Sequence, residues 1–249
     1  MKSGQRGVFR QPRQYSLRME FLIDSVLSAL LLLGSFDPEV YFVIYVSLKV
    51  SLSSTLISSL FGIPTGFLIS FNEFHGKRGV ITFLNSLLAL PTVVVGLLVY
   101  AFISRRGLLG MLDLLYTQTA MVIGQVILIF PVVTSLTIAA INRIDMRYRK
   151  TAMTLGATSL QTARVIFREA RFGIVAAIIA AFGRVISEIG ISMMLGGNAR
   201  GYTRTMTTAM ALEYDKGEFV LGVALGLVLL VISFGMNIFF NHLQGRSRA

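Results

Sequence analysis

Two long runs without a charged residue constrain this chain most. Residues 80–104 and 114–142 contain no Asp, Glu, Lys or Arg. A hydrocarbon core of about 30 Å is crossed by about 20 consecutive apolar residues in a helix, and both runs are longer than that. Hydrophobic residues make up 54% of the 249 residues and charged residues 14%, whereas a soluble domain has about 25% charged residues. The sequence therefore predicts an all-α polytopic membrane protein.

About six transmembrane helices are expected in a single transmembrane domain over residues 21–241. The predicted spans cover residues 21–36, 40–70, 80–103, 118–141, 172–195 and 219–240. Polar tails are expected at residues 1–20 and 242–249. A polar loop is expected after the Gly196–Asn198 turn.

The second span has the clearest start. Asp37 precedes Pro38, which is the pattern of an acidic N-cap followed by proline at the first helical position. Five serines lie between residues 51 and 59 and give this helix a surface suited to close packing in lipid. In the third span, the LPTVVVG motif at 90–96 combines proline and glycine. It indicates either a kink with close packing or part of a gate or pore wall.

The basic residues determine the expected orientation. The net charge of +11 would suit a nucleic-acid-binding protein, but the basic residues here lie at the ends of the apolar runs, so no nucleic acid is expected. With six spans, both termini lie on one side of the membrane. That side, which includes residues 143–171, carries sixteen Lys and Arg, and the other side carries five. The positive-inside rule then places both termini and residues 143–171 in the cytosol.

The segment 143–171 has the pattern of a helix, a break and a second helix. Ile144, Tyr148, Ala152 and Leu155 recur at three- and four-residue steps and share one helical face. Gly156 follows, where a helix end accepts a left-handed residue. Thr158 with Gln161 three positions later is the pattern of a capping box, so a second helix is expected to begin there and to continue into the span 172–195.

The sequence offers little chemistry of its own. There is no Cys and no GxxxxGK[ST] phosphate loop, and His75 and His242 lie far apart. We therefore expect no catalytic residue, no metal site and no cofactor. Arg184 and Glu188 are four residues apart inside the fifth span and are expected on one helical face. They could be an ion pair that locks helices together or the lining or gate of a transport path, and the sequence leaves both readings open.

The segment TAMTLGATSLQTARVI resembles the cytosolic loop of binding-protein-dependent ABC importer permeases. Ala152, Gly156 and Ile166 fall at the positions of that loop's alanine, glycine and isoleucine, while Lys150 and Thr151 replace its Glu and first Ala. Arg168 and Glu169 replace its Leu-Pro. The motifs GRVISEIG and GGN…TRTMTTA are similar to those of the tungstate permease subgroup within the tungstate and molybdate oxyanion uptake family.

The resemblance implies a type I ABC importer permease fold with a cytosolic coupling helix. It implies a homodimer of two permeases on two copies of a separate ABC ATPase subunit, which alone hydrolyses ATP, and an extracytoplasmic oxyanion-binding protein. The residues implied to contact the ATPase are Arg147, Tyr148, Thr151, Ala152, Leu155, Gly156 and Ala157. Those expected at the translocation path or gate are Arg184, Glu188 and Asn198.

The expected function is import of an oxyanion by alternating access across a bacterial or archaeal cytoplasmic membrane, and the resemblance implies tungstate as the cargo. Molybdate or another oxyanion is the alternative cargo. A secondary transporter would show inverted repeats and interrupted helices with ion-coupling acids, and a membrane enzyme would show acids, His or Cys clustered at one depth. Neither pattern is visible. A secondary transporter and a purely structural membrane subunit stay as alternatives, and only the family resemblance counts against the structural subunit.

Overall fold

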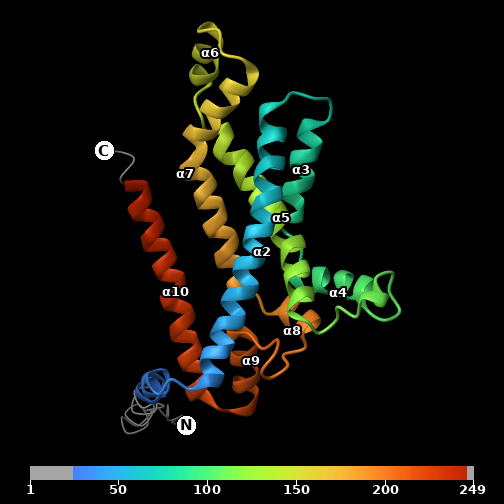
Figure 1. Ribbon diagram of the computed structural model, residues 1–249, viewed down its shortest axis with the longest axis vertical. Helices are drawn as coiled ribbons and strands as arrows, with labels where there is room; N and C mark the ends of the chain where they lie inside the picture. Colours follow the sequence, from blue (N-terminus) through green and yellow to red (C-terminus); the bar gives the residue numbers. More distant parts are fainter. Residues whose placement is uncertain (1–24, 246–249) are drawn as a thin grey trace, which may run out of the picture.

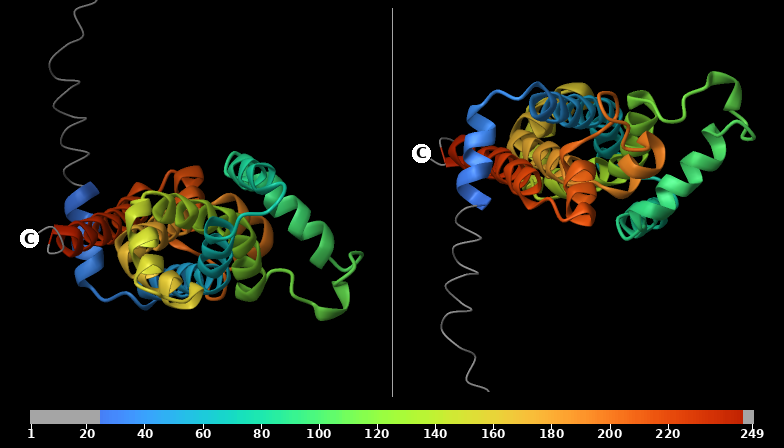
Figure 2. Two further views of the ribbon diagram at one scale, coloured as in Figure 1. Left: turned by 90° about the horizontal axis from the view of Figure 1, so that it is seen from above. Right: turned by 90° about the horizontal axis from the view of Figure 1, so that it is seen from below.

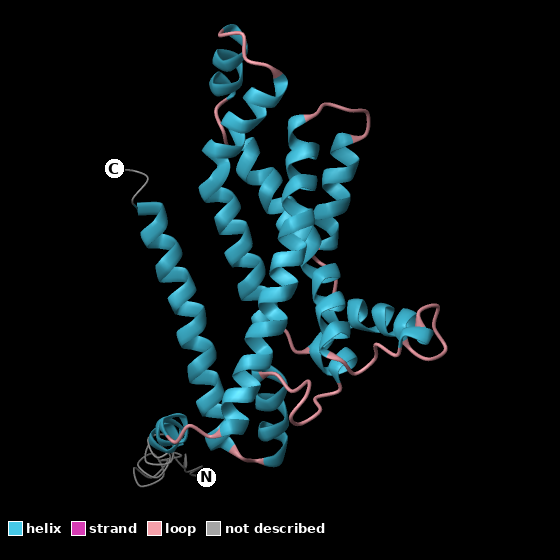
Figure 3. Cartoon of the chain, viewed as in Figure 1, coloured by secondary structure: helices cyan, strands magenta, loops and turns pink. Residues whose placement is uncertain are grey.

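The computed structural model describes residues 25–245, which form helices joined by short loops, with no strand among them (Figure 3). The helices in chain order are Ser25–Gly34, α2 (Pro38–Phe71), α3 (Lys77–Leu87), α4 (Thr92–Ile103), the 3-10 turn η1 (Gly110–Leu112), α5 (Gln118–Asn142), α6 (Met146–Thr154), α7 (Ser159–Ile186), α8 (Gly190–Gly196), α9 (Met206–Lys216) and α10 (Phe219–Gly245). Figure 1 shows a long bundle with α6 at one end and α9 at the other.

Three described helices are long and apolar enough to cross a membrane, and five spans result if each of two bent helix pairs counts as one. The expected tail 1–20 and the start of the span 21–36 lie outside the described residues. The described part of that span is the ten-residue helix Ser25–Gly34, about 15 Å long at 1.5 Å per residue. It lies across the long axis of the bundle at the end opposite α6 (Figures 1 and 2).

Helix α2 begins where the sequence predicts. Asp37 is its N-cap, and the Asp37 carboxylate accepts hydrogen bonds from the backbone N–H groups of Glu39 and Val40. Helix α2 packs along α5, and of the five serines Ser51, Ser54, Ser58 and Ser59 are buried. Small side chains let two helix backbones approach closely in an apolar medium, so this stripe fixes the central α2–α5 pair.

The stretch 80–103, expected as one span, is two helices that meet at an angle of 97°. Before the bend, Leu88, Ala89 and Leu90 donate to carbonyls three residues back, so the helix tightens and ends. Pro91 then has no N–H to continue the ladder and disfavours a helical residue before it. Pro91 is the N-cap residue of α4, which leaves the bundle sideways (Figure 1).

The fifth span is also interrupted. Helix α7 runs without a break from Ser159 through Gly173, as expected, but it ends at Ile186, and the short helix α8 follows at 59°. The segment expected as a polar loop after Asn198 contains helix α9. Its Thr205–Thr208 capping box is a start signal that the sequence carries and that the prediction missed.

The core is formed where α2, α5, α7 and the bent pairs meet. Its buried apolar side chains include Val46, Val50, Val99, Ile129 and Leu195. A second cluster joins α2 and α7 to α9 and α10, and a third lies under α6. Helix α10 is otherwise poorly covered, with 11% of its most apolar window buried, as suits a helix in contact with lipid.

Candidate functional site: the tip around α6 and the polar residues of the bundle

Helix α6 is a short helix with a defined start and stop. The Asp145 side chain caps its N-terminus by accepting the backbone N–H of Arg147 at 2.8 Å. At the other end, Ala157 N–H donates to Ala152 O and Gly156 N–H donates to Met153 O, both at 3.0 Å. These two bonds make a Schellman motif around a left-handed residue.

Gly156 is that residue, with φ of +77°, as predicted. A Cβ at Gly156 would have no neighbour within 4 Å, so the cost of adding one is backbone strain. Thr158 and Gln161 form the predicted capping box: the Gln161 side chain accepts from Thr158 N–H at 2.8 Å and Thr158 Oγ1 accepts from Gln161 N–H at 3.4 Å. The helix–glycine–helix geometry expected from the sequence is therefore confirmed.

The residues predicted to contact an ATPase lie at the tip of the molecule, around α6 (Figure 1). Leu155 is 81% exposed and Tyr148 is 47% exposed. Arg147, Thr151 and Gly156 are exposed, and Ala152 and Ala157 are half-buried. Two apolar neighbours that the prediction omitted, Met153 and Leu160, are 60% and 77% exposed. The tip thus presents a small apolar surface beside basic side chains.

The base of α6 is attached to three helices. The Arg149 guanidinium carbon lies 4.9 Å from the centroid of the Phe71 ring at the end of α2. Ile144, just before α6, packs on the cluster that includes Ile141 of α5 and Ile166 of α7. These contacts and the chain connections link α6 to α2, α5 and α7.

Arg184 and Glu188 are not arranged as expected. Helix α7 ends between them, so they do not share a helical face, and they form no ion pair in the structure of residues 25–245. Arg184 is exposed, whereas Glu188 is 7% exposed and its Oε1 accepts the backbone N–H of Ile191 at 3.2 Å, inside the first turn of α8. The physical reason is local: the free N–H groups of a new helix attract a carboxylate.

Asn198 lies in the turn after α8. It has φ of +51°, in the left-handed region. Its Nδ2 donates to Thr208 O at 3.3 Å, while its Oδ1 is buried without a hydrogen-bond partner. Thr207 Oγ1 donates to Glu188 O at 3.0 Å. The segment from Asn198 to α9 therefore closes over the break between α7 and α8, and it brings Asn198 and Glu188 into one polar region that Arg184 does not join.

A buried polar ladder crosses the bundle beside this region. Ser54 Oγ donates to Gln125 Oε1 at 2.9 Å, and Gln125 Nε2 donates to Ser192 Oγ at 3.4 Å. All three side chains are at most 2% exposed. The ladder ties α2, α5 and α8 together. Sequence reasoning missed it, and the signal was Gln125, one of two Gln residues in an uncharged run.

A second set of polar contacts holds the segment after α8 to the bundle. The Arg200 guanidinium donates to Glu39 with Nε–Oε1 at 2.6 Å, and Arg204 Nη1 lies 3.6 Å from Glu39 Oε1. The hydrogen bond with Glu39 raises the pKa of Arg200 above its ordinary value. Gln118 Nε2 donates to Tyr202 O at 2.6 Å, and Gln118 Oε1 accepts from Lys49 Nζ at 2.9 Å. These contacts lie at the end of the bundle away from α6.

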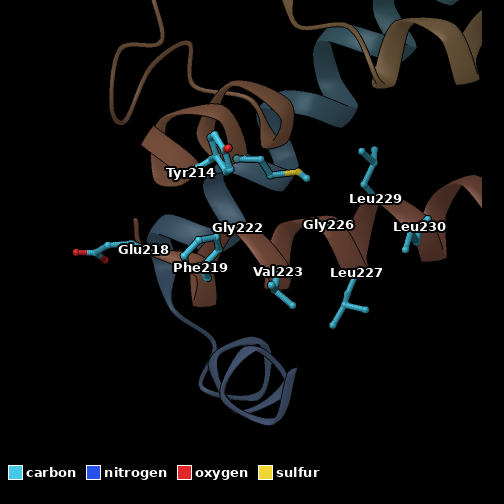
Figure 4. Close-up of a pocket in the computed structure, with 10 residues that line it drawn as sticks. Tyr214, Glu218, Phe219, Gly222, Val223, Gly226, Leu227, Leu229 and Leu230 are labelled. Atoms are coloured by element: carbon cyan, nitrogen blue, oxygen red, sulfur yellow. The ribbon is translucent and has the colours of Figure 1, made fainter. Parts of the chain in front are cut away.

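A cavity of about 520 Å³ between α9 and α10 does not suit an anion (Figure 4). Its described lining is apolar apart from Tyr214 and Glu218, and it contains no cation. In Figure 4 the Glu218 carboxylate points away from the other labelled side chains. In the described part of the chain, no three His, Asp or Glu side chains gather as metal ligands.

Solved structures define the class of fold. The chain superposes on a chain of the MetNI methionine ABC transporter in an inward-facing conformation with a TM-score of 0.66, covering 82% of this chain and 94% of the other at 15% identity. It superposes on a chain of a bacterial alginate ABC transporter solved with a pentasaccharide-bound periplasmic protein, with a TM-score of 0.68, covering 96% of this chain and 89% of the other at 19% identity. The fold is that of a type I ABC importer permease.

Sequence relatives show which family of ABC importer permeases the chain is similar to. The family of binding-protein-dependent transport system inner membrane components matches residues 59–249. The "Tungstate uptake system permease protein TupB" of Peptoclostridium acidaminophilum is 40% identical, over 91% of this chain and 99% of that protein. That of Campylobacter jejuni is 37% identical, over 90% and 93%. The "Molybdenum transport system permease protein ModB" of Escherichia coli K12 is 29% identical, over 79% and 93%.

The chain belongs to the family of binding-protein-dependent transport system inner membrane components. It is a multi-pass membrane protein, and the family resemblance drawn from the sequence is confirmed.

Proposed function

We propose that this protein is the membrane-spanning subunit of an ATP-driven importer that moves tungstate into the cytoplasm. The cargo is supported by the 40% and 37% identity to tungstate permeases over nine-tenths of the chain. Molybdate is the second candidate, and the molybdenum permease of E. coli is more distant at 29%.

The main observation in support of a permease driven by a separate ATPase is the exposed tip around α6. A nine-residue helix, capped at both ends and set at the extremity of the bundle, has the shape of an element that another subunit holds. ATP hydrolysis then belongs to a separate ABC ATPase, which contacts Arg147, Tyr148, Thr151, Ala152, Leu155, Gly156 and Ala157. The excess of Lys and Arg in residues 143–171 supports a cytosolic position for α6. Both termini are proposed to be cytosolic.

The coupling step follows from the attachments of α6. When two ATPase subunits close on ATP, they displace α6 as a rigid body. Arg149 of α6 contacts Phe71 of α2, and Ile144, just before α6, packs against α5 and α7, so we expect the displacement to rotate the spans. The permease alternates between inward-open and outward-open arrangements, and an extracytoplasmic binding protein delivers the oxyanion to the outward-open one.

The exposed position of Arg184 supports a dimer of two permease copies. An exposed guanidinium near the end of a membrane-spanning helix costs several kcal/mol if it faces lipid. A second permease copy that encloses a water-filled path against this face removes that cost. We assign Arg184 to the wall of this path, where it attracts an oxyanion, and we assign Glu188 and Asn198 to the polar region that closes it.

The test is to purify the permease with its ATPase and measure ATP hydrolysis in lipid nanodiscs. Binding protein loaded with tungstate should stimulate hydrolysis severalfold, and binding protein loaded with molybdate or sulfate should stimulate it less. Equal stimulation by sulfate, or no associated ATPase, would contradict the proposal.

A further inference from the structure

A cavity of about 610 Å³ lies beside the turn that follows α4. It belongs to the arm that α4 and η1 form at the side of the bundle (Figures 1 and 2). Its polar lining consists of two guanidinium groups, two phenols, one hydroxyl and one carboxylate, from Arg105, Arg106, Tyr100, Tyr116, Ser104 and Asp113. None of these residues has a role in the transport mechanism described above.

The backbone of this turn is tightly constrained. Gly107 N–H donates to Ser104 O at 2.7 Å, and Leu109 N–H donates to Phe102 O at 2.9 Å. A Cβ on Gly107 would collide with the carbonyl oxygens of Ala101 and Phe102. The chain is therefore folded back directly after the two arginines, which fixes their backbone at the edge of the cavity.

The opposite wall is held in a strained conformation. Asp113 and Tyr116 have φ of +43° and +62°, a region that residues other than glycine seldom occupy. Tyr116 N–H donates to Leu195 O at 2.8 Å, and the Tyr116 ring lies against Gly197, where a Cβ would come within 2.7 Å of Cδ1. The turn that carries Asn198 thus holds Tyr116 in place, and strain of this kind is typical of functional sites.

The charges of the lining favour an anion. Arg105 Nε lies 4.0 Å from Asp113 Oδ1, so one positive charge is partly compensated. Arg106 forms no ion pair with any described residue, and the lining keeps one net positive charge. A hydrogen bond with Tyr100 raises the pKa of Tyr116 above its ordinary value. Guanidinium forks and hydroxyl donors match the oxygens of a tetrahedral oxyanion.

We propose that this cavity binds a tetrahedral oxyanion, with Arg106 and Arg105 as the charged contacts and, as a neutral donor, the one phenol hydroxyl that the Tyr100–Tyr116 hydrogen bond leaves free. Two sources have this chemistry: free tungstate on its way to the path, and the phosphate of an anionic lipid headgroup. The first rests on the proposed function and the second does not. Because the Asp113 carboxylate opposes an anion, binding is weak and reversible, as transit requires.

The experiment measures tungstate bound by the purified permease–ATPase complex, without binding protein, in nanodiscs of phosphatidylcholine. Equilibrium dialysis with metal analysis gives the dissociation constant for wild type and for Arg105→Gln/Arg106→Gln. Arg164→Gln/Arg168→Gln is the matched control, because it removes the same charge from exposed positions on α7. A second arm counts phosphatidylglycerol molecules retained by the complex in native mass spectrometry. Tyr116→Phe is a milder variant that removes only one hydroxyl.

A tenfold or greater weakening of tungstate binding in the Arg105/Arg106 variant, with a twofold to fivefold weakening in Tyr116→Phe, supports the site and identifies the free oxyanion. Loss of retained phosphatidylglycerol in the same variants supports the site and identifies the headgroup. If both measurements match the control variant, the proposal is overturned. Tungstate uptake by cells that carry the wild-type transporter is measured separately, so failure of this site and failure of the proposed function are distinguishable.

Discussion

The guanidinium carbon of Arg149 lies 4.9 Å from the centroid of the Phe71 ring, which joins α6 to the last residue of α2. A cation over an aromatic face contributes about 0.5–2 kcal/mol, depending on how far it is desolvated. This contact joins α6 to a long apolar helix that is not its neighbour in the chain.

Arg149→Ala should uncouple transport from hydrolysis. Without the ring contact, α6 moves without carrying α2, so we expect severalfold fewer oxyanions imported per ATP hydrolysed in proteoliposomes, while the ATPase still copurifies. Lys150→Ala is the control, since it removes a neighbouring exposed charge. An unchanged transport-to-hydrolysis ratio in Arg149→Ala would show that the Arg149–Phe71 contact does not couple α6 to α2.

Gly156→Val should weaken ATPase association. A β-branched residue at φ of +77° costs roughly 1–2 kcal/mol in backbone strain. A Cβ at this position has no neighbour within 4 Å, so a loss of ATPase binding would be due to distortion of the turn. We expect several times less ATPase in pull-downs. Gly156→Asn is the control, because Asn tolerates the left-handed region. Full copurification with Gly156→Val would contradict docking at this turn.

Arg184→Ala should lower uptake without releasing the ATPase, because Arg184 is exposed far from α6 and is assigned to the path. Arg184→Lys keeps the charge and should retain most of the uptake. The measurement is initial tungstate uptake together with ATPase copurification. Uptake and coupling equal to wild type in Arg184→Ala would remove this residue from the path.

Gln125→Leu should destabilise the bundle. The change breaks the hydrogen bonds to Ser54 and Ser192 and leaves their buried hydroxyls without this partner, at a cost of about 1–3 kcal/mol. The thermal unfolding midpoint in detergent should fall by a few degrees. Ser53→Ala, at a half-buried neighbouring position with no hydrogen bond from its side chain, should leave the midpoint unchanged. A midpoint equal to wild type in Gln125→Leu would show that the ladder is energetically neutral.

Local signals in the sequence predicted several elements well. The Asp37 cap, the glycine stop at Gly156 and the capping box at Thr158 each depend on residues within a few positions of one another, and the structure has all three. The uncharged run 114–142 likewise gives one continuous helix, α5.

The breaks inside spans could not be located in the same way. At the break after Ile186, Glu188 bonds the start of α8, and the Glu188 carbonyl accepts from Thr207, which lies 19 positions away. The ladder through Gln125 joins residues 71 and 67 positions apart. Such contacts are decided by tertiary packing, so periodicity alone predicted a shared face for Arg184 and Glu188 that does not exist.

The most direct test of the proposed role of α6 uses a single cysteine. The chain has none, so Leu155→Cys, at an 81% exposed position, introduces a unique thiol at the tip. In the assembled transporter this thiol should cross-link to the ATPase subunit and should resist a membrane-impermeant maleimide added to intact cells. Labelling from outside the cell would contradict the cytosolic position of α6. The absence of a cross-link to a nucleotide-hydrolysing subunit would contradict the claim that an ATPase binds α6.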